Sequence, residues 1–87
     1  MSEDELIARV SQARQKVVGT KQTLKALEKG KAVMVLLAGD AEEKVSAPVA
    51  ALAGSRDVKV HYIETMSELG KICGIKVKAA AAAIIEF

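Results

Sequence analysis

Polar and cationic side chains gather in the stretch Gly19–Leu27, whose sequence GTKQTLKAL is typical of the start of a helix. The first turn of a helix carries unpaired backbone N–H groups and the positive end of the helix dipole, so Lys21 is unfavourable there. A bound anion would satisfy these N–H groups together with Lys21 and Lys25, and Gly19 would let the backbone of a partner approach closely. Phosphate is the natural ligand for such a site.

An ordinary structural explanation stands beside this one. Gly19 could end a preceding helix, Thr20 could be a simple N-cap, and Lys21 and Lys25 could form an i,i+4 pair on a solvated helix face. On these residues alone, both interpretations remain open.

Other chemistries lack the residues that they need. There is no G-x-x-x-x-G-K-[ST] loop between Gly19 and Gly30 and no G-x-G-x-x-G motif, so the fingerprints of ATP and dinucleotide binding are missing. The only histidine, His61, falls on an expected strand without a Ser or Cys partner, and Cys73 is most simply a buried small hydrophobic residue. We therefore expect no enzyme, no metal site and no cofactor.

The length and composition limit the kind of fold. A chain of 87 residues builds one domain with one core, and 51% hydrophobic residues with 28% charged residues are typical of a globular protein. No apolar run approaches the roughly 20 residues that span a membrane, and the start Met1–Glu5 is acidic, unlike a secretory leader. Since a single cysteine also fits a reducing compartment, we expect a cytoplasmic protein.

The lysines fall in two groups, although the net charge is only +2. One group is Lys16, Lys21, Lys25, Lys29 and Lys31, and the other is Lys71, Lys76 and Lys78. The fold could bring the two groups together, but each could also be an ordinary solvated face. With only Tyr62 and Phe87 as aromatic residues, the chain has no platform for stacking bases, so nucleic-acid recognition would use helix ends, cations and aliphatic groups.

Helix start and stop signals predict the helices. Ser2 and Glu5 form a capping box, and apolar residues recur at helical spacing from there to about Val18. A second helix begins at Thr20 and ends near Gly30.

Two further capping boxes follow, Asp40–Glu43 and Thr65–Glu68. The first opens a third helix in which Pro48 either separates the first turn or causes a kink. The second opens a short helix that stops at Gly74.

Three segments are predicted to be strands. The apolar run Ala32–Ala38 is typical of a strand buried on both faces, and Val58–Ile63 alternates as expected for a strand near an edge. Ala79–Ile85 has helical propensity, but small residues followed by two isoleucines favour a strand on which helices pack closely from both sides. Strands that alternate with helices indicate an α/β sandwich with a small sheet between helical layers.

Three blocks of the sequence resemble one protein family. They are Gly19–Leu27, Ala38–Ala41 (AGDA) and Leu69–Val77 (LGKICGIKV), and their order and spacing are similar to those of the kink-turn-binding large-subunit ribosomal protein family, above all its small bacterial members. The resemblance covers nearly the whole chain and implies one RNA-binding domain over residues 1–87, folded as a three-layer α-β-α sandwich with a small mixed four-stranded sheet. The ligand that it implies is an RNA kink-turn, in which a bulge bends the helix beside tandem sheared G·A pairs.

At the G·A pairs, the resemblance implies contacts from the start of the second helix. The family's contact residues fall here on Gly19, Thr20, Lys21, Gln22 and Lys25. Gly19 and Thr20 would meet the RNA backbone, Lys25 would reach guanine acceptors or phosphate, and Gln22 would hydrogen-bond a base edge. The commonest family pair at this place is Asn-Glu, so Lys21-Gln22 is a departure that changes the base contacts.

At the bulge, the family's loop covers a flipped-out nucleotide with aliphatic side chains. In this chain the loop falls on Ile75, Lys76 and Val77. Lys76 stands where an acidic residue is frequent, which favours phosphate contact, and Lys78 would also neutralise phosphate. An aliphatic loop suits a chain with few aromatic residues.

Two functions from different classes remain. The first is binding of kink-turn RNA, either ribosomal RNA or a structured regulatory RNA, by a monomeric, ribosomal-protein-like component of a ribonucleoprotein with no membrane partner. The second is a protein-protein interaction adaptor of the same fold. Because an adaptor has no need of cations at a helix start beside an aliphatic loop, we favour RNA.

Overall fold

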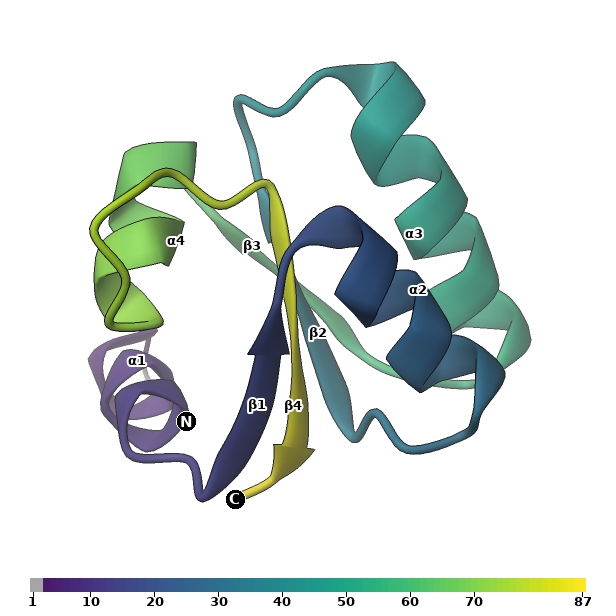
Figure 1. Ribbon diagram of the computed structural model, residues 1–87, viewed down its shortest axis with the longest axis horizontal. Helices are drawn as coiled ribbons and strands as arrows, with labels where there is room; N and C mark the ends of the chain where they lie inside the picture. The colour runs from purple at the N-terminus through teal and green to yellow at the C-terminus, as the bar shows by residue number, and fades with distance from the viewer. Residues whose placement is uncertain (1–2) are drawn as a thin grey trace.

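One mixed sheet of four strands forms the centre of the computed structural model, which describes residues 3–87 (Figure 1). The strands are β1 (Gln15–Val18), β2 (Met34–Ala38), β3 (Val60–Ile63) and β4 (Ala81–Glu86), in the spatial order β1-β4-β2-β3. β4 is antiparallel to both β1 and β2, whereas β2 and β3 are parallel. The edge position predicted for the strand in Val58–Ile63 is confirmed, because β3 is an outer strand.

Two pairs of helices cover the two faces of the sheet (Figure 1). On one face lie α1 (Glu3–Ser11) and α4 (Met66–Ile72), and on the other lie α2 (Thr20–Glu28) and α3 (Glu43–Ser55). Alternate residues of β2 serve the two cores, with Leu36 packed among residues of α1 and α4 and Leu37 among residues of α2 and α3. This arrangement confirms the three-layer α-β-α sandwich.

The central strand β4 is built largely from alanines. Ala81, Ala82 and Ala83 are fully buried, and β4 is paired on both sides by β1 and β2. Their helix propensity is outweighed because small side chains let helices approach the sheet from both faces. The prediction of a strand in Ala79–Ile85 is therefore confirmed.

The segment before Gly19 differs from the sequence prediction. The first helix was expected to reach about Val18, but α1 ends at Ser11 and residues 15–18 form β1. The backbone of β1 finds its partners on β4, where Val17 lies opposite Ala83, and β-branched residues fit such a pleated surface. The predicted cap Ser2 lies outside the described residues.

The capping boxes have different outcomes. Thr65 caps α4 as predicted, since its hydroxyl accepts a hydrogen bond from the Glu68 amide at 3.1 Å. Asp40 does not cap α3, whose N-cap is Glu42 and makes no side-chain cap bond. Instead, Asp40 Oδ1 accepts a hydrogen bond from the Met66 amide at 2.8 Å, so this carboxylate also holds the start of α4. A carboxylate at a helix N-terminus is favoured by the helix dipole.

Helix α3 contains Pro48 without a separate first turn. The proline lacks the N–H that would bond to the carbonyl of Lys44, one turn earlier, and Lys44 is exposed, so water can satisfy that carbonyl.

None of the helices within residues 3–87 is long and apolar enough to cross a bilayer.

The burial of β4 on both faces makes it sensitive to added volume. We expect Ala82→Leu to lower the free energy of unfolding by about 1–3 kcal/mol, because the larger side chain must displace packed neighbours. The matched control is Ala51→Leu on the exposed side of α3, which should change it by no more than about 0.5 kcal/mol. Urea unfolding midpoints measure both, and equal stability of the two variants would show that β4 has room beside it.

Candidate nucleic-acid interface

The start of α2 and the segment before β4 lie at the same end of the sheet (Figure 1). The Gly19 amide donates a hydrogen bond to the Ala81 carbonyl at 2.8 Å, and the Ala38 amide donates one to the Ala80 carbonyl at 2.9 Å. Because β1 ends where β4 begins, the antiparallel pairing brings the helix start close to residues 75–78, which we call the 75–78 loop. The structure therefore brings together two stretches that are about 50 residues apart in the sequence.

Helix α2 begins without a side-chain cap. Its N-cap is Gly19, with φ 113° and ψ 149°, a conformation that favours glycine, and Thr20 is the first helical residue. Since β1 precedes Gly19, the alternative in which this glycine ends a helix is wrong. The carbonyl of Gly19 is occupied, because the buried Thr23 hydroxyl donates to it at 2.8 Å, and the first turn has no acidic residue.

The polar residues of α2 share one outer face. Lys21, Gln22 and Lys25 are exposed. Gln22, Lys25 and Lys29 follow at i, i+3 and i+7, and they line a groove between α2 and the neighbouring strands whose floor includes Val17. We call it the α2 groove. Of the site residues predicted on this helix, it gathers Gln22 and Lys25 and leaves Lys21 outside.

The 75–78 loop presents one apolar and two cationic side chains to solvent. Val77 is 69% exposed, and Lys76 and Lys78 are exposed as well. Ile75 is different, because it is partly buried against the core between the sheet and the helices α1 and α4. Only Val77 is therefore free to cover a ligand with its whole aliphatic side chain.

Helix α4 fixes the shape of this loop. The Ile75 amide donates to the Gly70 carbonyl at 3.0 Å, and the Ala79 amide donates to the Met66 carbonyl at 3.1 Å. Between these two bonds the Val77 carbonyl lies directly against Gly70, where a Cβ atom would overlap it. The loop is thus tied to the helix at both ends and pressed onto it in the middle.

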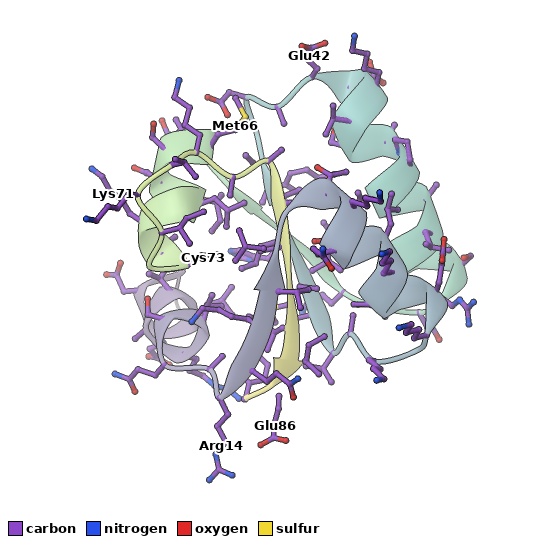
Figure 2. The ribbon with its side chains drawn as sticks, in the orientation of Figure 1. Arg14, Glu42, Met66, Lys71, Cys73 and Glu86 are labelled. Atoms are coloured by element: carbon purple, nitrogen blue, oxygen red, sulfur yellow. The ribbon has the colours of Figure 1, made fainter. Side chains whose placement is uncertain are left out.

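The cations around the two stretches have no ion-pair partner among the side chains that the structure describes, those of residues 4–87. No carboxylate in that range lies within ion-pair distance of Lys21, Lys25, Lys71, Lys76 or Lys78. Figure 2 shows Lys71 pointing outward from α4, whereas the ion pair of Arg14 and Glu86, at 3.5 Å, lies at the other end of the sheet. Unpaired lysines beside an uncapped helix start favour the approach of an anion to these two stretches.

Cys73 is a core residue. It points inward between α4 and the sheet, and burial raises the pKa of its thiol, although the Lys16 cation opposes part of this shift (Figure 2). The prediction of a buried small hydrophobic residue is confirmed. In the part of the chain that the structure describes, no three His, Cys, Asp or Glu side chains are placed to hold a metal ion.

Sequence reasoning missed part of the α2 groove. Gln15 and Val17 line it from β1, a segment assigned above to a helix, and Lys31 lines it from the turn after α2. The pair Val17-Val18 directly before Gly19 was the available signal, since two β-branched residues before a glycine favour a strand over a helix.

Comparison with known proteins finds one protein family and several relatives whose names describe RNA-binding proteins. A profile of the ribosomal protein L7Ae/L30e/S12e/Gadd45 family matches residues 2–87. An RNA-binding protein of Halalkalibacterium halodurans is 47% identical to the chain over 76 residues, which cover 87% of this chain and 93% of the relative. The RNA-binding protein YbxF of Geobacillus stearothermophilus is 44% identical over 77 residues, which cover 88% of this chain and 94% of the relative.

The fold is also similar to a solved structure. The 15.5kD RNA binding protein of Giardia lamblia superimposes with a TM-score of 0.85 at 25% sequence identity, over 100% of this chain and 78% of that protein. The α/β architecture with its mixed sheet is therefore shared over the full length of this chain.

The contact between Gly70 and the 75–78 loop can be tested directly. Gly70→Ala should lower the free energy of unfolding by about 1–3 kcal/mol and speed hydrogen exchange of the Ile75 and Ala79 amides, because the loop must move away from α4. Gly54→Ala is the matched control, since its new methyl meets nothing within 4 Å and should be neutral or stabilising by up to about 1 kcal/mol. Unchanged amide exchange in Gly70→Ala would show that Gly70 does not hold the loop.

Proposed function

The chain belongs to the ribosomal protein L7Ae/L30e/S12e/Gadd45 family, and we propose that it is an RNA-binding protein that recognises kink-turns. The observation that carries the proposal is the union, at one end of the sheet, of an uncapped cationic helix start and a loop with an exposed aliphatic side chain. RNA bulges and bent backbones are read by shape, phosphate contact and exposed bases, and these two stretches offer a contact for each. The names of the relatives support RNA as the ligand.

The start of α2 would approach the tandem G·A pairs. Gly19 presents no side chain, so the RNA backbone can come close to the amides of the first turn. Gln22 has both a donor and an acceptor and is exposed on the face of the groove, where it can hydrogen-bond a base edge. Lys25 lies one turn further and would reach a guanine acceptor or a phosphate.

The 75–78 loop would cover the flipped-out nucleotide of the bulge. Val77 can pack on an unstacked base without help from an aromatic ring, and Lys76 and Lys78 flank it with charges for the adjacent phosphates. Because α4 holds the loop in one shape, little ordering entropy would be lost on binding.

The unpaired lysines favour RNA over a protein partner. An adaptor of the same fold would need complementary apolar surface more than cations. Among the described residues, the large apolar side chains that are more than half exposed come from three separate segments, namely Val33, Tyr62 and Val77. The monomeric state and the choice between ribosomal and regulatory RNA stay predictions.

Discrimination between two RNAs tests the function. A kink-turn duplex and the same duplex with its G·A pairs replaced by Watson–Crick pairs would be titrated with the protein in an electrophoretic mobility assay. We expect clearly tighter binding of the kink-turn. Equal affinity for both RNAs would overturn kink-turn recognition, and no binding of either would overturn RNA binding itself.

Substitutions of Gln22 and of Lys76 should affect RNA binding in different ways. Gln22→Ala should reduce the discrimination between the two duplexes, by about 1–3 kcal/mol if the amide contacts a base as well as a good side-chain pair does in DNA. Lys76→Ala should weaken both RNAs alike and flatten the plot of log affinity against log salt by roughly one unit or less. Titrations of both variants at several salt concentrations measure the two effects, and an equal loss on both RNAs for Gln22→Ala would show that Gln22 reads no base.

Val77 and Ile75 form a second matched pair. Val77→Ala should weaken kink-turn binding while the free energy of unfolding changes by no more than about 0.5 kcal/mol, because its side chain is mostly exposed. Ile75→Ala should cost stability, since Ile75 packs against the core and truncation of a fully buried isoleucine costs about 2–5 kcal/mol. If Val77→Ala binds the kink-turn as tightly as the wild type, this loop does not cover a base.

A further inference from the structure

Among the residues that the structure describes, Thr23 is the one polar side chain that is buried, with none of its surface exposed. It shares the inward face of α2 with Ala26 and Leu27, which pack on the sheet. A buried hydroxyl costs free energy unless it has a hydrogen-bond partner, whereas an alanine or a valine at this position would need none. Packing alone therefore does not explain why residue 23 carries a hydroxyl.

The partner of this hydroxyl is the carbonyl at the start of the helix. The Thr23 hydroxyl donates to the Gly19 carbonyl at 2.8 Å, and the Thr23 amide donates to the same oxygen at 2.9 Å. The amide bond is the ordinary first bond of a helix and would satisfy this carbonyl by itself. A threonine hydroxyl that bonds to the carbonyl four residues earlier tends to destabilise a helix slightly. The second bond thus restrains Gly19 and is not needed to stabilise α2.

Gly19 is the flexible connection between β1 and α2. Its φ of 113° and ψ of 149° lie in a region that favours glycine, and glycine has the widest choice of backbone conformations. The Gly19 amide is bonded to the Ala81 carbonyl at 2.8 Å, so the peptide before Gly19 is held by β4. The peptide after Gly19 is held at its carbonyl by the two bonds from Thr23.

The restraint on this carbonyl also sets the direction of an amide. A peptide unit is a rigid trans plane, in which the C=O and the N–H point in opposite directions. Because the Gly19 carbonyl points into the helix toward Thr23, the Thr20 amide of the same peptide points away from the first turn. Helix α2 has no side-chain cap to accept a bond from this turn. Thr23 therefore directs a donor without a side-chain partner outward from the helix start.

We propose that Thr23 is a positioning residue for RNA recognition. Its buried hydroxyl fixes the Gly19–Thr20 peptide, and with it the first turn that carries Gln22, in the geometry that meets the tandem G·A pairs. This inference rests on the proposed function, which places the start of α2 at those pairs. Thr23 is too deeply buried to touch RNA itself, so it acts through its neighbours by reducing the ordering entropy that binding costs.

Substitutions at residue 23 separate the hydroxyl from the shape of the side chain. Thr23→Val keeps the shape and Thr23→Ala keeps a strong helix former, but both lack the hydroxyl, whereas Thr23→Ser retains it. We expect the two hydroxyl-free variants to bind the kink-turn about two- to tenfold more weakly than the wild type, the factor that one net hydrogen bond represents. Thr23→Ser should restore most of the affinity. Electrophoretic mobility titrations measure these affinities, at a temperature where thermal melts show each variant to be folded.

Two further readouts distinguish positioning from a purely structural role. Binding of the duplex with replaced G·A pairs should be the same in all variants, and the salt slope on the kink-turn should not change, because no charge is removed. In the free protein, NMR order parameters of the Thr20 and Lys21 amides should fall in Thr23→Val, while those of β4 stay at the wild-type value.

A matched control removes a similar hydrogen bond from another helix. The Ser55 hydroxyl, on the last residue of α3, donates to the Leu52 carbonyl at 2.9 Å. Ser55→Ala deletes this bond from a hydroxyl to a backbone carbonyl outside the proposed interface. Its affinity for the kink-turn should equal that of the wild type. A loss as large as that of Thr23→Val would show that the effect is not specific to the start of α2.

The outcomes separate this inference from the function on which it rests. If Thr23→Val and Thr23→Ala bind the kink-turn as tightly as the wild type, or if Thr23→Ser loses as much affinity as they do, the hydroxyl does not position the site. Equal losses on both duplexes, or unchanged order at Thr20 and Lys21, would also overturn the inference. A wild type that binds both duplexes equally would instead overturn kink-turn recognition, whatever the variants at residue 23 do.

Discussion

Because β4 lies between β1 and β2 and is covered by helices on both faces, the three-layer arrangement depends on how closely those helices can approach one strand. Ala81, Ala82 and Ala83 add little apolar area themselves, and they allow leucines and isoleucines from the neighbouring elements to pack across the sheet. The Ala81 carbonyl of the same strand accepts a hydrogen bond from the Gly19 amide. The packing of the core and the position of the first turn of α2 are therefore set by one strand.

The 75–78 loop, which is the second part of the proposed site, depends on α4, a helix that would not be stable in isolation. α4 has seven residues, and an isolated helix of that length is unstable in water. Thr65 and Asp40 hold its start, and Leu69 is buried against the sheet. The 75–78 loop is hydrogen-bonded to this helix, so Asp40, in the turn after β2, contributes indirectly to the shape of the loop.

Local signals predicted the elements whose stability is local. The apolar run of β2, the cap at Thr65 and the helix that begins at Thr20 all follow from neighbouring residues. β1 was missed because Val17 continues the helical spacing of Val10, whereas residues 15–18 form a strand only by pairing with β4, more than 60 residues later. Asp40 was misassigned for a similar reason, since its partner Met66 is 26 residues away.

The candidate site was predictable to a similar extent. Its first stretch, from Gly19 to Lys25, was predicted from residue types and from a family resemblance, and of these residues Gln22 and Lys25 line the α2 groove. The difference between Ile75 and Val77 could not be read from the sequence, because both are β-branched and their burial depends on how the loop lies on Gly70. The α2 groove was not predicted either, since one of its walls is β1, which the sequence pattern had assigned to a helix.

The position of β4 has a consequence for how the chain acquires its shape. β4 is the last element along the described residues, yet it is central in the sheet, so β1 and β2 have no common neighbour until residues 81–86 have been synthesised. Until then both strands expose unpaired edges, and pairing them requires closing loops of high sequence separation. A nascent chain would therefore remain without a finished sheet until β4 emerges, and chains that stop before β4 would be vulnerable to aggregation rather than competent to fold.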